Sequence, residues 1–188
     1  MGPENDLYAL LEKRCGSEEK ATAALHSLSL ELGLGRKIPT DSLAGLALIR
    51  LGFDAEKVAS TLDWNEFEDL CAKLLTSSGY EVRRNIVLTK PRKQIDVFAT
   101  SSLMSLSVDC KHYMNSISPY SLVRFAGEQL ERTRLYKQRQ GHNGPILPMI
   151  LTLFDAISPV VDGVPVVPLL KIRSFLQSVS PYDGFAVV

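Results

Sequence analysis

The spacing of hydrophobic residues changes along the chain near residue 62. Before that point, leucines recur at intervals of three and four residues, as in Leu25, Leu28 and Leu32. This spacing places the leucines on one face of a helix, and Ser17 is a suitable N-cap in front of it. Residues 1–61 are therefore predicted to form a small, all-helical N-terminal domain.

Beyond residue 62 the pattern alternates between helical stripes and short strand-like runs. The predicted helices cover residues 64–78, 118–139 and 168–179, and the predicted strands cover residues 80–88, 94–99, 105–111, 146–154 and 164–167. Strands interleaved with helices of this length favour an α/β fold, in which helices pack on a mixed sheet. Residues 62–188 are predicted to form this second domain.

Composition narrows the class of protein. Of the 188 residues, 45% are hydrophobic and 22% are charged, which is typical of a globular protein. The formal net charge is zero, so the protein as a whole does not attract a polyanion electrostatically. Three widely spaced cysteines predict neither a disulfide framework nor a zinc site and favour a reducing cytoplasm. The apolar run 146–154 is too short to cross a bilayer, so no membrane association is expected.

Charged residues occur inside two of the predicted strands. In the third strand, Asp109 and Lys111 are two residues apart and therefore share a face, while Asp96 interrupts an apolar stretch of the second strand. Burying such charges costs several kcal/mol unless they are paired or bind a metal. One interpretation is a structural salt bridge between Asp109 and Lys111, with Asp96 capping a turn. The other is an active site.

Four segments in sequence favour the active site. Residues 63–179 resemble the PD-(D/E)xK nuclease superfamily, in particular its Mrr-like restriction endonuclease branch. The resemblance implies a restriction-endonuclease-like core with the element order αβββαβ, and it does not extend to residues 1–61. The segments that carry it are Trp64-Asn65-Glu66-Phe67-Glu68, Gly79-Tyr80-Glu81-Val82, Gln94-Ile95-Asp96-Val97 and Val108-Asp109-Cys110-Lys111-His112-Tyr113.

The resemblance implies a role for each matching residue. Asp96 and Asp109 would hold Mg²⁺, with Mn²⁺ able to substitute, and Glu68 would complete the metal shell from the first helix. Lys111 would orient or help deprotonate the attacking water and stabilise developing negative charge. Hydrolysis of a phosphodiester needs a nucleophile at neutral pH and neutralisation of transition-state charge, and a hard cation on carboxylate oxygens supplies both.

The match departs from the family pattern at two places. The acid at position 109 is Asp, where the Mrr-like branch more often has Glu, and the segment 91–94 lacks the glycines common there. Gln129 and Tyr136 are similar to a Gln/Tyr motif of recombination nucleases in the same superfamily, although core packing is the favoured explanation of Tyr136 and explains Gln129 equally well.

Two basic clusters flank the predicted site, and neither contains an acid over residues 82–95 or 132–154. Clustered cations are typical of phosphate binding, although two solvated faces would look the same. The predicted nucleic-acid-binding residues are Arg83, Arg84, Lys90, Arg92, Lys93, Gln129 and Arg132.

These observations favour a Mg²⁺-dependent DNA endonuclease of restriction type. The alternatives are a structure-specific recombination nuclease, such as a Holliday junction resolvase, and a nucleic-acid-binding module without catalysis. A purely structural interaction domain would leave the basic clusters unexplained. Cutting both strands of a duplex requires two sites of opposite polarity, so a homodimer is expected.

Overall fold

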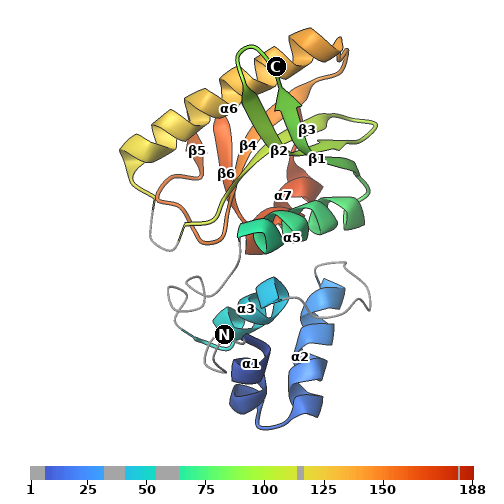
Figure 1. Cartoon of the computed structure of the whole chain (residues 1–188), viewed down its shortest axis with the longest axis vertical. Helices are drawn as coiled ribbons and strands as arrows, with labels where there is room; N and C mark the ends of the chain where they lie inside the picture. The colour runs from blue at the N-terminus through green and yellow to red at the C-terminus, as the bar shows by residue number, and fades with distance from the viewer. Residues whose placement is uncertain (1–6, 32–40, 54–63, 114–116, 182) are drawn as a thin grey trace.

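The computed structural model describes residues 7–31, 41–53, 64–113, 117–181 and 183–188 (Figure 1). The first part of the chain contains the helices α1 (Leu7–Cys15), α2 (Glu18–Glu31) and α3 (Asp41–Arg50), as the leucine spacing predicts. The backbone N–H of Lys20 donates to Ser17 Oγ at 3.3 Å, which confirms the predicted cap of α2. Leu32 and the proposed domain boundary between residues 61 and 62 lie outside the described residues.

The remaining elements follow the predicted αβββαβ order, with small differences at their ends. They are α5 (Trp64–Ser77), β1 (Glu81–Leu88), β2 (Lys93–Thr100), β3 (Ser105–Lys111), α6 (Pro119–Gln140), β4 (Ile146–Thr152), β5 (Val160–Val161), β6 (Val164–Pro168), the 3-10 turn η2 (Leu169–Lys171) and α7 (Ile172–Ser178). Within the described segments, no helix has both the length and the apolar character needed to cross a membrane.

Six strands form one mixed sheet in the order β1-β2-β3-β4-β6-β5. Strands β1, β2 and β3 pair antiparallel, whereas β3, β4 and β6 pair parallel because α6 carries the chain back between β3 and β4. Helices α5 and α7 pack against one face of the sheet and α6 covers the other, so the charged strand residues lie between two helical layers (Figure 1).

The edge strand β5 is the one strand that the hydrophobic pattern did not predict. It pairs antiparallel with β6 through a two-residue turn, in which Asp162 and Gly163 have φ values of 50° and 77°. Two consecutive positive φ values are typical of a type I′ hairpin, for which Asp-Gly is a favoured sequence. The Asp-Gly pair between Val161 and Val164 was therefore a usable signal for this hairpin.

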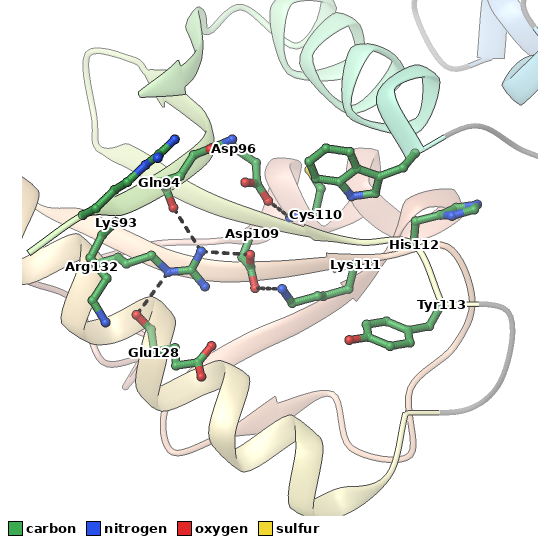
Figure 2. A pocket seen from close by; sticks show the side chains of 12 residues that line it. Lys93, Gln94, Asp96, Asp109, Cys110, Lys111, His112, Tyr113, Glu128 and Arg132 are labelled. Carbon is green, nitrogen blue, oxygen red and sulfur yellow. Dashed lines mark hydrogen bonds and ion pairs between the residues drawn. The ribbon is translucent and has the colours of Figure 1, made fainter. Parts of the chain in front are cut away.

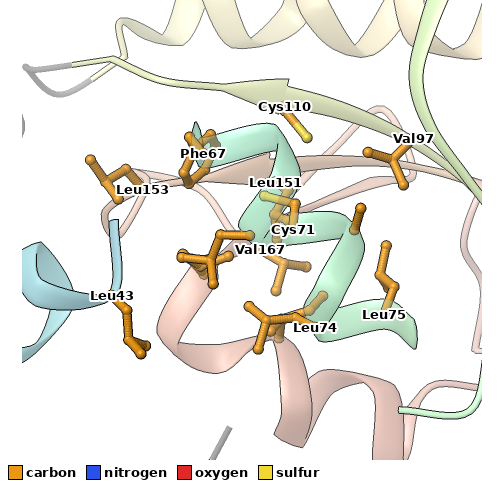
Figure 3. Close-up of a cluster of buried hydrophobic side chains, with 14 of the residues drawn as sticks. Leu43, Phe67, Cys71, Leu74, Leu75, Val97, Cys110, Leu151, Leu153 and Val167 are labelled. Atoms are coloured by element: carbon orange, nitrogen blue, oxygen red, sulfur yellow. The ribbon is translucent and has the colours of Figure 1, made fainter. Parts of the chain in front are cut away.

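The N-terminal helices and the sheet share one hydrophobic cluster. Figure 3 shows Leu43 of α3 beside a cluster that includes Phe67 and Cys71 of α5 and Leu153 beyond β4. Contacts between α3 and α5 join the two parts. The division into residues 1–61 and 62–188 therefore stays a prediction. Because the cluster is shared, the test of this division is whether residues 62–188 fold without residues 1–61.

We expect a chain that begins at residue 62 to fold on its own. The sheet with α5, α6 and α7 keeps both of its faces covered, whereas the removed part contributes to one end of the cluster only. Circular dichroism and thermal unfolding of the truncated chain measure this, and a cooperative transition is the expected result. A non-cooperative or aggregated product would show that residues 1–61 complete a single core.

Candidate active site

Strand β3 separates its apolar and charged residues by alternation. Leu106, Val108 and Cys110 belong to the hydrophobic cluster on the α5 side. Asp109 and Lys111 lie on the opposite side, where Asp109 contacts Arg132 of α6. The prediction that Asp109 and Lys111 share a face is confirmed, because side chains of a strand alternate between its two sides.

Asp96 lies where β2 and β3 separate. The last paired residues of this ladder are Val97 and Val108, and beyond them Asp96 Oδ2 accepts a hydrogen bond of 2.9 Å from the backbone N–H of Cys110. Simple alternation would put Ile95 and Val97 on the same side of the sheet, but Val97 packs on the α5 side whereas Ile95 packs with residues on the α6 side. The strand therefore twists at Asp96, and its carboxylate enters the gap between the two strand ends.

The separated strand ends open into a cleft with a volume of ≈ 620 Å³. Figure 2 shows Asp96, Asp109 and Lys111 directed into this cleft from β2 and β3. Trp64 lines it from the start of α5, and α6 closes one side. The complete lining consists of Trp64, Arg92, Lys93, Gln94, Asp96, Asp109, Cys110, Lys111, His112, Tyr113, Glu128 and Arg132.

Two cations contact the buried carboxylate of Asp109. Lys111 Nζ lies 2.8 Å from Oδ2, and Arg132 Nη1 lies 3.2 Å from Oδ1. Arg132 is itself fixed, because Nη1 donates to the Gln94 carbonyl at 3.1 Å and Nε donates to the Glu128 carbonyl at 3.2 Å (Figure 2). The structural salt bridge anticipated between Asp109 and Lys111 is thus present, and it holds both side chains at the cleft.

Glu68 lies behind the cleft and is not part of its lining. Its side chain is 1% exposed, and Oε2 lies 3.9 Å from Arg84 Nη2. Among the described residues, none provides a hydrogen-bond partner for Glu68 Oε1. Burial raises the pKa of Glu68, Arg84 opposes this rise, and the charge of Asp109 adds to it. Glu68 therefore turns inward from α5 as expected, while its role as a metal ligand stays a prediction.

Asp96 is the most strongly perturbed acid of the cleft. Burial, followed by the negative charge of Asp109, raises the pKa of Asp96 from 3.8 to about 7, against the stabilising hydrogen bond from Cys110. Glu68 raises the pKa further and Arg132 lowers it. Three carboxyl groups therefore interact electrostatically across the gap between β2 and α5, which is an arrangement that a bound cation would relieve.

We expect Asp96→Asn to stabilise the protein above pH 7 in EDTA. A pKa raised from 3.8 to about 7 means that the folded state retains a proton which the unfolded state releases. This group therefore stabilises the fold fully below about pH 4, and its contribution is lost as the pH rises through 7. Asparagine does not ionise, so the variant does not lose this stability, and its amide oxygen still accepts from the backbone N–H of Cys110. The free energy of unfolding of the variant should therefore exceed that of the unchanged protein above pH 7, by an amount on the order of 2 kcal/mol.

Urea unfolding at pH 5 and pH 8 measures this difference. The matched control is Asp183→Asn, in which the changed carboxylate is exposed and accepts from the backbone N–H of Ser180. An advantage of Asp96→Asn that is equal at both pH values would contradict the electrostatic account.

The donor set fits a small divalent cation through two carboxylates. Within the described part of the chain, no group of three or more His, Cys, Asp and Glu residues is placed to hold a metal ion. Mg²⁺, however, is usually held by only one or two carboxylates, together with water and substrate phosphates. Asp96 and Asp109 meet that requirement, because both line the cleft and their charges interact.

Comparison with known families gives one match. Residues 59–139 match the model of the Mrr catalytic domain, described as restriction endonuclease. This segment is therefore similar to restriction endonucleases. The match runs from the start of α5 to the end of α6 and includes all three charged strand residues. Comparisons with curated proteins and with solved structures give no match.

The predicted nucleic-acid-binding residues are dispersed. Arg92, Lys93 and Arg132 line the cleft, although Lys93 also pairs with Glu131 at 3.1 Å. Arg84 does not line the cleft and pairs with Asp69 of α5 at 2.9 Å. The other two cations, Arg83 and Lys90, are exposed outside the cleft.

Gln129 requires a correction. It was predicted to contact nucleic acid, but it is fully buried, and Nε2 donates to the carbonyl of Ser107 at 2.6 Å and to Ser107 Oγ at 3.1 Å. A side chain that joins α6 to β3 inside the core cannot contact a nucleic acid. Tyr136 is buried as well, with its ring 4.3 Å from that of Phe98, in agreement with the core-packing interpretation.

Several residues that line the cleft were not among the predicted site residues. They include Trp64, His112, Tyr113 and Glu128. His112 packs against Phe67 with ring centroids 5.7 Å apart, on the side of the cleft away from α6. Helical periodicity could not reveal Trp64, because the first residue of a helix has no preceding turn to pack on.

Proposed function

We propose that the protein is a metal-dependent endonuclease that hydrolyses phosphodiester bonds of DNA. The observation that carries the proposal is the convergence of Asp96, Asp109 and Lys111 on one cleft, within the segment that matches the restriction endonuclease family. The acids come from neighbouring strands and interact electrostatically, and the lysine adjoins one of them. Such a set suits the hydrolysis of a phosphate ester.

Asp96 and Asp109 would hold Mg²⁺ or Mn²⁺ in this cleft. When bound, the cation would activate water and neutralise charge on the phosphate. The cation would also offset the repulsion that raises the pKa of Asp96, so its binding would release a proton near neutral pH. Glu68 would assist from behind, either as a further ligand after a side-chain rotation or as a fixed negative charge.

Lys111 and Arg132 would act on the substrate. Both cations neutralise Asp109 in this structure, so a cation bound at Asp109 would free part of their hydrogen-bonding capacity. Lys111 Nζ would then orient the attacking water and donate to the phosphate oxygens as negative charge develops. Arg132 is held to the Gln94 carbonyl and is suited to contact the same phosphate through its planar fork.

Cleavage assays test the proposal directly. Supercoiled plasmid, linear duplex and branched DNA are incubated with the protein in Mg²⁺, in Mn²⁺ and in EDTA. Cutting with either cation and none in EDTA is expected. Cutting of branched DNA alone would favour the junction-resolving alternative. Binding of DNA without cutting under any metal condition would favour a non-catalytic binding module and contradict the proposal.

The cysteines support an assignment to a reducing compartment such as the cytoplasm. Cys15, Cys71 and Cys110 are free, although Cys71 and Cys110 are both buried in the same cluster. Contact with Cys71, followed by burial, raises the pKa of the Cys110 thiol well above its ordinary value. Neighbouring thiols that stay reduced are typical of cytoplasmic proteins.

We expect the active form to be a homodimer. One cleft of this kind cuts one strand, and the two strands of a duplex run in opposite directions, so a two-fold pair of chains provides two sites with the required polarity. Light scattering in the presence of a short duplex should give a mass of two chains. Double-strand breaks made by a strictly monomeric protein would contradict this expectation.

A further inference from the structure

Two large aromatic side chains line the cleft and remain open to solvent. Trp64 is 46% exposed and Tyr113 is 43% exposed. Other aromatic side chains next to the site, such as Phe67 and Phe125, are buried. Leaving large apolar surfaces exposed within a concave site forgoes the stabilisation that burial provides, and such surfaces commonly mark ligand sites.

The two aromatic residues come from different elements and line the same cleft. Trp64 is the first residue of α5, while Tyr113 follows β3 by two residues. The Tyr113 ring lies 5.7 Å from the ring of Phe125 on α6, and Lys111 Nζ lies 4.6 Å from the same Phe125 ring. Phe125 therefore contacts both Tyr113 and Lys111, and Tyr113 lies next to Lys111 in the cleft (Figure 2).

The remaining lining residues define the chemistry of the ligand. The cleft also presents four cations, namely Arg92, Lys93, Lys111 and Arg132. Aromatic faces stack on nucleobases, and cations neutralise phosphates, so the combination is typical of sites that bind unpaired nucleotides. The volume of ≈ 620 Å³ lies within the range of about 300–1,000 Å³ found for small-molecule sites.

We infer that the cleft binds an unpaired nucleotide next to the phosphate that is cut, with its base stacked on Trp64. In an intact duplex, each base hides its faces within the stack, so an aromatic side chain reaches a base only where the strand is single or locally unpaired. The preferred substrate is therefore single-stranded DNA, or a duplex with a bulge or gap at the cut site. This inference rests on the proposed function and specifies its substrate.

Tryptophan fluorescence tests the stacking directly, because Trp64 is the only tryptophan in the chain. The full-length protein is titrated in EDTA with three DNA probes of one sequence: a single strand, a paired duplex, and the duplex with a bulge of three nucleotides. The single strand and the bulged duplex should quench the emission saturably, and the paired duplex should not. Equal quenching by all three probes would overturn the inference.

Variants of Trp64 test whether the stacking that quenches its fluorescence also contributes to the affinity for single-stranded DNA. Trp64→Ala should weaken binding of the single strand, measured by anisotropy of a labelled probe, by about 5- to 100-fold, whereas Trp64→Phe should retain most of it. The matched control is Tyr120→Ala, because Tyr120 is 81% exposed and lies outside the cleft. Thermal unfolding verifies that each variant is folded. Equal affinities of Trp64→Ala and the unchanged protein would overturn the inference.

The cleavage assay separates this inference from the proposed function. If paired duplex is cut with Mg²⁺ as fast as bulged duplex, and Trp64→Ala cuts both normally, the stacking site is wrong and the nuclease stands. If no DNA is bound and none is cut with Mg²⁺ or Mn²⁺, both the nuclease and its substrate preference are wrong.

Discussion

Asp96→Asn is expected to reduce metal-dependent cleavage of DNA by about 1,000-fold or more, because a cation held at the reacting phosphate contributes several kcal/mol to lowering the barrier. The substitution removes one of the two carboxylates that line the cleft. Asparagine is preferable to alanine here, because Asp96 Oδ2 accepts from the backbone N–H of Cys110 and alanine would leave that buried donor without an acceptor. The rate of plasmid cutting at saturating Mg²⁺ measures the effect.

The control for this prediction is Asp183→Asn, which makes the same chemical change at an exposed carboxylate and should cut at the unchanged rate. Calorimetric titration with Mn²⁺ provides a second measurement, in which Asp96→Asn should bind the cation at least ten-fold more weakly, about 1.4 kcal/mol. Full activity in Asp96→Asn would show that Asp96 is not part of the active site and would contradict the proposed metal site.

Lys111→Met is expected to lower the rate of cleavage by about 100-fold or more while leaving the affinity for Mn²⁺ equal or higher. The Lys111 ammonium lies 2.8 Å from Asp109 Oδ2, so it competes with a cation for that carboxylate and, once released, is placed to act on the substrate. Methionine keeps an unbranched apolar side chain at this position and removes only the ammonium, which lies 4.6 Å from the centroid of the Phe125 ring. Loss of rate with retained metal binding separates a role in the reaction from a structural role.

Lys171→Met is the matched control for this substitution. Lys171 pairs with Asp155 at 2.5 Å on an exposed surface, so its removal also breaks a lysine–aspartate pair but at a distance from the cleft. It should cut DNA at the rate of the unchanged protein. If Lys111→Met lost activity only because it bound Mn²⁺ more weakly, Lys111 would be a support for Asp109 and would take no part in the reaction.

Much of the second domain was predictable from the sequence, because its signals are local. Alternation in β3 placed Asp109 and Lys111 on one face, and Ser118-Pro119 and Gly141 are typical capping residues at the two ends of the helix predicted over residues 118–139. The structure agrees: Ser118 Oγ accepts from the backbone N–H of Ser121, and Gly141 adopts a left-handed conformation at the C-cap. Each of these features depends on neighbours within four residues, so the local sequence is sufficient to predict them.

The arrangement around the charged residues depended on partners distant in sequence. Arg132 reaches Asp109 across 23 residues, and the buried contact of Gln129 with Ser107 spans 22. No periodicity distinguishes a glutamine that faces solvent from one that joins a helix to a strand, which is why Gln129 was placed wrongly. The twist at Asp96 likewise follows from the separation of β2 from β3, which is a property of the sheet.

The sequence by itself determined the order of elements apart from β5, the charged trio Asp96, Asp109 and Lys111, and the similarity of their segment to restriction endonucleases. Only the tertiary structure decided which side chains complete the cleft, since the lining combines α5, β2, β3, α6 and the chain after β3. The physical reason is that hydrophobic burial positions whole elements, and the surfaces left between them form the site. Trp64 and Tyr113 are therefore recognised as part of the cleft only after the core around Phe67 and Phe125 has placed them there.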